Sequence, residues 1–167
     1  MGCQWLLRFA SQEGTGFLFS VCPSRIDKLS GAFSFRTSLF RRKIHSDPQI
    51  SFTFAPISST FKTTSNTSGC PAGFVGKFGF NARLTDKNTS PPLSNLLVKV
   101  TALSNGNLLQ NADGGPAGVG ATLTVPKTGG FADAMLSPGQ FVDVPFVICL
   151  KTRTAFSFFV DVMGVQR

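Results

Sequence analysis

The sequence predicts an all-β protein whose carboxyl-terminal part is an antiparallel β-sandwich, and two observations predict this fold. After residue 73, five runs alternate apolar and polar residues with a period of two, as half-buried strands do. Stretches rich in Gly, Pro, Asn and Asp, which favour turns, separate these runs. We therefore expect the sandwich over residues 74–167, a linker or first strand over residues 49–73, and a poorly ordered basic N-terminal extension over residues 1–48.

The expected strands, in chain order, are "FGFNARL" (residues 78–84), "LLVKVTAL" (96–103), "ATLTV" (121–125), "VDVPFVICL" (142–150) and "FSFFVDV" (156–162). Every second residue of each run is apolar, which predicts one face directed at a core. The expected core residues are Phe78, Phe80, Ala82, Leu84, Leu96, Val98, Val100, Ala102, Ala121, Leu123, Val125, Val142, Val144, Phe146, Ile148, Leu150, Phe156, Phe158, Val160 and Val162.

The last two runs predict an antiparallel hairpin that closes the sandwich. A register that opposes Leu150 to Phe156 and Phe146 to Val160 keeps both apolar faces on the same side. It leaves a five-residue loop over residues 151–155. Pro145 has no backbone N–H, so its nitrogen should face an edge, a bulge or solvent.

The other face of this expected hairpin is unusually apolar. It carries Phe141, Val147, Phe159 and Met163 beside Cys149, Asp143, Asp161 and Ser157. One explanation is cover by the chain before residue 73, for example by "ISFTF" (residues 50–54). The other is an interface with a second copy or a partner, because large exposed apolar patches are uncommon in monomers.

Composition favours packing over recognition chemistry. The chain has 18 Phe, one Trp and no Tyr, so its aromatic rings offer few polar tips for hydrogen bonding to a ligand. The net charge of +8 is divided evenly: seven Lys and Arg stand against three acidic residues up to Pro48, and nine against five afterwards. The one dense basic cluster is "FRRKIH" (residues 40–45), which we interpret as a solvated tail, because no nucleic-acid recognition motif accompanies it.

Residues 1–48 show no sustained period and no apolar run long enough to predict a transmembrane segment. Arg8, Gln12 and Glu13 interrupt the only candidate for a secretory signal, so no convincing signal peptide is present. Two explanations of this Arg-, Ser- and Phe-rich segment stay open: a targeting segment and a mis-assigned start.

"LSPGQFVDVPFVICL" followed by "FSFFVDVMGV" resembles the closing strands of bacterial extracellular immunoglobulin-like and fibronectin type III-like modules. Such modules often place a Leu-x-Pro-Gly turn before an alternating strand. The resemblance implies an immunoglobulin-like sandwich, a secreted or cell-envelope location, and binding to a protein or a glycan. The sequence lacks a core Trp of the kind found in immunoglobulin domains, since Trp5 lies outside the module.

Two of the four cysteines, Cys70 and Cys149, belong to this part of the chain. A disulfide between them and two unpaired thiols are both compatible with the pattern. No metal site is expected: no CxxC occurs and His45 is the only His, while Asn111 and Asp113 in "NADGG" are a weak calcium candidate that we interpret as a turn. No cofactor is expected.

Catalysis has little support, because the expected sandwich has no His to activate a nucleophile. We therefore expect a non-catalytic extracellular or cell-envelope module for binding or presentation. A structural subunit that associates through the Phe141/Phe159 face is the first alternative. A small hydrolase that uses Asp143 and Asp161 is the second.

Overall fold

The structure, a computed structural model, describes residues 16–18, 34–36, 52–87 and 91–166. β1 (Gly16–Leu18) and β2 (Ser34–Arg36) pair with each other in an antiparallel ribbon. The remaining strands are β3 (Phe52–Thr64), β4 (Gly76–Asp86), β5 (Leu93–Leu103), β6 (Leu108–Leu109), β7 (Thr122–Thr124), β8 (Met135–Leu136), β9 (Phe141–Leu150) and β10 (Phe158–Gln166), with the 3-10 helix η1 (Gly129–Phe131) before β8. The rest of the expected extension, residues 1–15, 19–33 and 37–48, lies outside the described residues, as do residues 49–51 of the expected linker or first strand.

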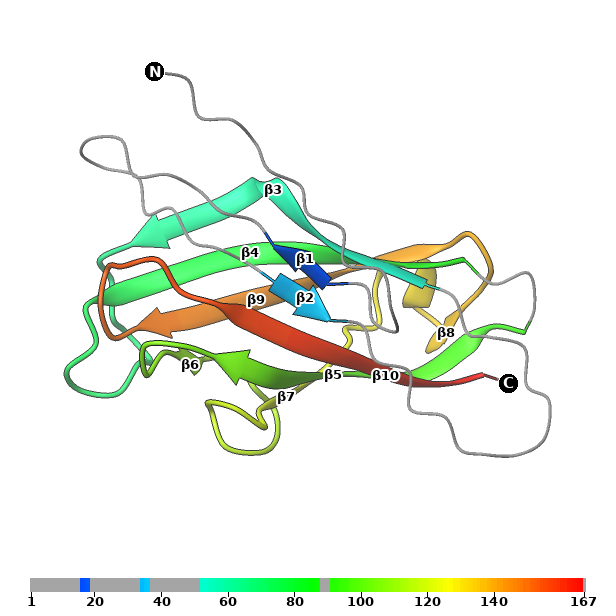
Figure 1. The fold of residues 1–167 in the computed structure, drawn as a ribbon. Helices are drawn as coiled ribbons and strands as arrows, with labels where there is room; N and C mark the ends of the chain where they lie inside the picture. The colour runs from blue at the N-terminus through cyan, green and yellow to red at the C-terminus, as the bar shows by residue number, and fades with distance from the viewer. Residues whose placement is uncertain (1–15, 19–33, 37–51, 88–90, 167) are drawn as a thin grey trace, which may run out of the picture.

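Two antiparallel sheets pack face to face, so the predicted β-sandwich is confirmed (Figure 1). One sheet has the strand order β3-β4-β9-β6, and we call it the β4 sheet. The other has the order β10-β5-β7, with β8 paired to the end of β5, and we call it the β5 sheet. All five predicted runs form strands in one sheet or the other.

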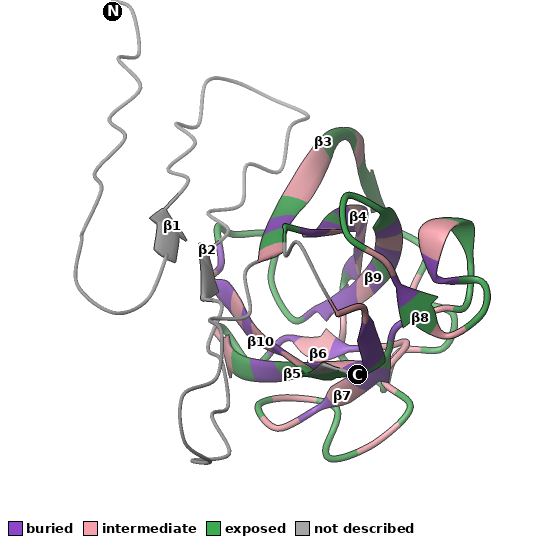
Figure 2. Ribbon diagram, turned by 90° about the vertical axis from the view of Figure 1, so that its right-hand side faces the viewer, coloured by how far each residue is buried: buried purple, intermediate pink, exposed green. Residues whose placement is uncertain are grey.

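The core lies between the sheets and is built from alternate residues of each strand. Figure 2 shows buried residues alternating with half-buried and exposed ones along both layers. Every expected core residue is buried except Ala102, which is half-buried. The centre is aromatic: the Phe146 ring lies 5.1 Å from that of Phe80 in its own sheet and 5.4 Å from that of Phe158 in the other. Burial of each such ring stabilises the fold by about 1.5–3 kcal/mol.

Residues 52–64 form β3, so of the two alternatives for residues 49–73 the structure selects a first strand, followed by a loop. β3 pairs with β4 through a wide bulge, where the register passes from Ile57 opposite Asn81 to Lys62 opposite Gly79. The Thr60 hydroxyl lies inside the bulge. It accepts a hydrogen bond from the Asn81 N–H at 2.8 Å, which satisfies a donor that the bulge would otherwise leave unpaired.

The predicted hairpin of the last two strands is wrong. β9 pairs with β4 and β6, whereas β10 pairs with β5 in the other sheet, and residues 151–157 connect the two layers. Phe146 therefore faces Phe158 across the core instead of lying beside Val160 in one sheet. The period-two pattern fixes which face of a strand is buried. The pattern does not tell whether two such strands pair in one sheet or face each other from two sheets, because both arrangements bury the same faces.

Pro145 lies at an edge, one of the three places that the sequence allowed for its nitrogen. β6 is too short to reach it, and the Asn111 side chain takes the place of a strand there. The Asn111 amide donates to the Pro145 carbonyl at 2.9 Å and accepts from the Val147 N–H at 3.0 Å. Because the N–H and C=O of a strand residue point to the same side, the Pro145 nitrogen faces this edge and no ladder hydrogen bond is lost.

Candidate functional site: the disulfide-linked loop end

Three connections meet at one end of the sandwich, on the left in Figure 1, and we call this region the loop end. They are the β3–β4 loop (residues 65–75), the β5–β6 turn (residues 104–107) and the β9–β10 loop (residues 151–157). The strand registers bring them together, because Gly76 pairs with Leu150 and Phe158 pairs with Leu103.

A disulfide ties the longest of the three connections to the sheet. Cys70 of the β3–β4 loop is bonded to Cys149 of β9, with a Cα–Cα distance of 5.8 Å. The disulfide alternative for these two cysteines is thus confirmed. Cys149 projects from the outer face of β9 and is nevertheless 1 % exposed, since the loop folds back over it. The alternation of β9 could not predict this burial, because it depends on a segment 79 residues away.

Side chains hold the same loop at two further points. The Ser68 carbonyl accepts hydrogen bonds from the Lys77 ammonium at 2.7 Å and from the Gln110 amide at 3.0 Å. The Val75 carbonyl accepts a hydrogen bond from the Arg153 guanidinium at 3.1 Å. These bonds leave most donors of both cations available, since an ammonium has three N–H groups and a guanidinium has five.

Lys151 reaches the same loop from the β9–β10 connection. Its ammonium lies 5.1 Å from the centre of the Phe74 ring, within the range of a cation–π contact. It also lies 3.1 Å from where a Cβ on Gly73 would be, and Gly73 has a φ of +82°. Glycine is required here for its positive φ and for the close approach of the ammonium.

The β5–β6 turn fixes the third connection. The Asn107 side chain accepts a hydrogen bond from the Lys151 N–H at 2.9 Å, and the Asn105 amide donates to the Ala155 carbonyl at 2.8 Å. Ser104 and Ser157 exchange two more bonds, one through the Ser104 hydroxyl and one between backbones. The three connections therefore form one cross-linked polar surface.

The charge of the loop end has a single sign. Lys77, at the start of β4, and Lys151 and Arg153, of the β9–β10 loop, all contact the β3–β4 loop, and the three connections contain no Asp or Glu. Cations without nearby carboxylates create a positive potential that attracts anionic ligands. The sequence pattern does not reveal this grouping, because only the strand register brings the start of β4 to the β9–β10 loop.

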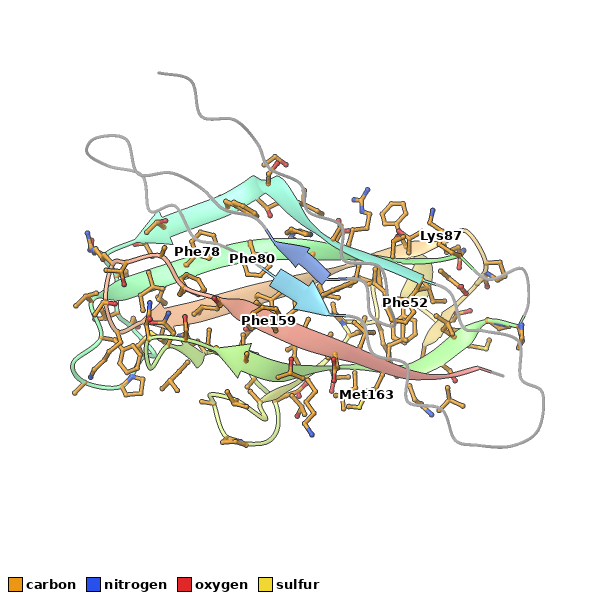
Figure 3. The ribbon with its side chains drawn as sticks, in the orientation of Figure 1. Phe52, Phe78, Phe80, Lys87, Phe159 and Met163 are labelled. Atoms are coloured by element: carbon orange, nitrogen blue, oxygen red, sulfur yellow. A yellow bond between two sulfur atoms is a disulfide. The ribbon has the colours of Figure 1, made fainter. Side chains whose placement is uncertain are left out.

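The apolar residues expected to form one interface do not lie on one surface. Phe141 and Val147 project from the outer face of the β4 sheet. Phe159 and Met163, labelled in Figure 3, project from β10 on the outer face of the β5 sheet. The two pairs are on opposite sides of the sandwich, because the hairpin that would have joined them does not form. Nor do Phe52 and Phe54 cover either pair, since they lie in β3 and pair with β4.

Asp143 and Asp161 are separated in the same way and cannot act on one substrate atom. Asp143, on β9, forms a bidentate ion pair with Arg83 at 2.7 and 2.9 Å, whereas Asp161 lies on β10 opposite Lys99. Hydrogen bonding to Arg83 lowers the pKa of Asp143 below its usual value, with a smaller Coulombic contribution, against a raising effect of burial. The Arg83 guanidinium also lies 3.9 Å from the centre of the Phe141 ring.

The side chains of the weak calcium candidate, Asn111 and Asp113, form hydrogen bonds with the protein backbone. Both polar atoms of the Asn111 side chain bond to β9, and the Asp113 carboxylate accepts from the Thr124 N–H at 2.7 Å. Each residue therefore satisfies backbone groups at a strand edge, as residues of a polar turn do. Among the described residues, no group of three or more His, Cys, Asp or Glu is placed to hold a metal ion.

We compared the chain with protein-family models, with curated proteins and with solved structures, and none of these comparisons found a match. Within the described part of the chain, no helix has the length and hydrophobicity needed to cross a bilayer. His45 and the basic cluster at residues 40–45 lie outside the described residues.

Proposed function

We propose that this protein is a non-catalytic extracellular or cell-envelope module of the immunoglobulin-like type, and that it binds or presents through the loop end. The observation that carries the proposal is the cross-linking of the loop end by a disulfide and by side-chain hydrogen bonds. Ordering these loops before a ligand arrives lowers the entropic cost of binding. A rigid scaffold that positions surface loops is a common arrangement for recognition.

The strand order supports the immunoglobulin-like assignment. The order β3-β4-β9-β6 matches the A-B-E-D sheet of immunoglobulin domains, and the adjacent β5 and β10 match strands C and F. The disulfide supports an oxidising compartment, since such bonds persist mainly in extracytoplasmic proteins.

Purification of the protein from its native cells, followed by intact-mass measurement, tests the location. We expect to find the protein in the secreted or envelope fraction, with a mass two hydrogens below that of the fully reduced chain. Recovery of reduced protein from the cytosol would contradict the proposal.

The ligand class that fits this surface is a polymer with repeated anionic groups, such as an acidic glycan. The β3–β4 loop contacts the side chains of Lys77, Lys151 and Arg153, and no carboxylate of the three connections competes for them. Fixed cations with unused donors suit carboxylate and sulfate groups, which accept several charge-assisted hydrogen bonds.

Binding to immobilised polygalacturonate, dextran sulfate and neutral dextran tests this assignment. Arg41, Arg42 and Lys43 are changed to Gln in every sample, so that the basic cluster does not contribute. We expect the two anionic polymers to bind and neutral dextran not to bind, with affinity falling as salt is added. Arg153→Gln and Lys151→Gln should each weaken binding about three- to tenfold, since an interfacial charge contact contributes roughly 0.5–1.5 kcal/mol.

Lys99→Gln is the matched control, because Lys99 is an exposed cation on the outer face of the β5 sheet, away from the loop end. An equal loss of affinity in the Lys99→Gln and Arg153→Gln variants would show that binding depends only on net charge. That result would contradict a binding site at the loop end. Binding to neutral dextran with the same affinity would contradict the anionic ligand class.

A further inference from the structure

The two sheets do not end at the same place on one side of the sandwich. Phe158 of β10 packs against Phe80 of β4 and Phe146 of β9, with ring centres 6.0 and 5.4 Å apart. β10 therefore lies across from β4 and β9. The β4 sheet continues by one more strand, β3, whereas β10 is the last strand of the β5 sheet within the described residues.

This leaves a long strand edge beside an apolar interior. β10 runs over nine residues, Phe158–Gln166, and its inward residues Phe158, Val160 and Val162 are buried. Alternate N–H and C=O groups of an antiparallel strand point to each neighbour, so half of the backbone groups of β10 face away from β5. The register with β5 shifts between Phe159 and Val160 and between Met163 and Val165, but the edge carries no Pro and no inward-facing charge to oppose the addition of a further strand.

The structure also contains a strand at the place where the β5 sheet stops. β2 lies beside β10, although it belongs to a separate ribbon with β1 (Figure 1). The sequence across β2, "FSFRTSL" (residues 33–39), alternates apolar and polar residues except for Thr37. This pattern suits a strand with one side towards a core.

We propose that β2 is the occupant of the edge of β10 that faces away from β5: residues 34–36 of this chain add to the β5 sheet by backbone pairing, opposite β3. The amino-terminal part of the chain then contributes a strand to the sandwich instead of being a detached tail. This inference does not depend on the loop end or on its ligand, which lie at the end of the strands and not along the edge of β10.

Amide hydrogen exchange on the full chain, read residue by residue by NMR, tests the proposal. At least one of the β10 amides that face away from β5 should exchange at least about tenfold more slowly than the same amide in an unstructured peptide. Ser34→Pro and Phe35→Pro each remove one N–H of β2, and successive N–H groups point to opposite sides of a strand. We therefore expect one of the two variants, and not both, to abolish this protection.

Ser11→Pro is the matched control, since it adds a proline outside β1 and β2 and should leave the protection unchanged. The β10 amides that face β5 stay protected in every variant and report that the sandwich is folded. Peptide-like exchange of the outward amides in the unmodified chain overturns the proposal, and so does protection that neither proline variant changes. Protection that increases with protein concentration also overturns it and assigns the edge to a second copy.

Discussion

The Asn111 side chain forms the hydrogen bonds that a neighbouring strand would form at the edge of β9. Replacing Asn111 measures how much these bonds contribute to the stability of the fold. Its side chain makes two hydrogen bonds, to the Pro145 carbonyl and the Val147 N–H. Asn111→Ala leaves both groups without a protein partner, so we expect unfolding free energy to fall by about 1–2 kcal/mol. Urea denaturation measures the loss.

Asn66→Ala is the comparison for this variant. Asn66 is exposed and its side chain bonds to a near neighbour, the Ser68 N–H, so water replaces the lost bond easily. We expect a smaller loss of stability. A loss equal to that of Asn111→Ala would show that Asn111 has no special role at the edge.

The Arg83–Asp143 ion pair predicts a pH dependence of stability. Because Arg83 lowers the pKa of Asp143 in the folded state, the pair stabilises the protein above the unfolded pKa of about 3.9 and loses its effect as the pH falls through the lower folded value. Arg83→Gln should therefore raise the pKa of Asp143. The difference in stability between the variant and the unmodified protein should shrink in strong acid to what the contact of Arg83 with the Phe141 ring contributes.

Carboxyl NMR titration of Asp143 measures this shift directly. Arg153→Gln is the control, since Arg153 donates to Val75 at the loop end and should leave the pKa of Asp143 unchanged. An Asp143 titration that is the same with and without Arg83 would disprove the predicted coupling.

The Cys70–Cys149 disulfide should be a large single contribution to stability. It closes a loop across a sequence separation of 79 residues, and the constraint on the unfolded chain is worth about 2–4 kcal/mol. We expect Cys70→Ser to lower the unfolding free energy by that amount, in a background where Cys3 and Cys22 are Ser. A reductant should destabilise the background protein and leave the Cys70→Ser variant unaffected; an equal response of both would contradict the prediction.

At the scale of the elements, the meeting of β9 and β10 across the core predicts an energetic coupling. Phe146 and Phe158 contact each other edge to face, at an interplanar angle of 71°. A double-mutant cycle with Phe146→Leu and Phe158→Leu should give a coupling of about 0.5–1.5 kcal/mol in denaturation experiments.

Phe131 supplies the control cycle, because it is buried in η1 at the opposite end of the sandwich from Phe158. The effects of Phe131→Leu and Phe158→Leu should add to within about 0.5 kcal/mol. Non-additivity of this pair, or strict additivity of Phe146 and Phe158, would contradict the packing described here.

The elements also show how far a periodic pattern can predict a fold. The alternation at Phe78, Val98 and Val144 identified strands and their buried faces correctly, because a side chain's direction depends only on its position along its own strand. For residues 52–64 the pattern allows both a linker and a strand, since the bulge of β3 between Ile57 and Lys62 interrupts the alternation. The neighbours of β9 and β10 were predicted wrongly, because pairing is a contact between distant segments.

At the scale of the whole molecule, the loop end gathers residues that sequence order keeps apart. Lys77 and Arg153 stand 76 positions apart, yet both donate to the β3–β4 loop. Cys70 could be named as a partner for Cys149 only as one of two possibilities, and the cations were not recognised as a group. Each grouping follows from strand registers that no local pattern contains.

The sequence alone determined the all-β class, the buried face of the main strands and the turns, since these depend on residue type and short-range periodicity. Only the tertiary structure decided which sheet each strand joins, that Phe141 and Phe159 lie on opposite sides, and that the cations of the loop end stand together. The physical reason is that hydrophobic burial specifies an inside and an outside for every strand. The choice of neighbours comes from the chain as a whole, through the registers that pack one common core.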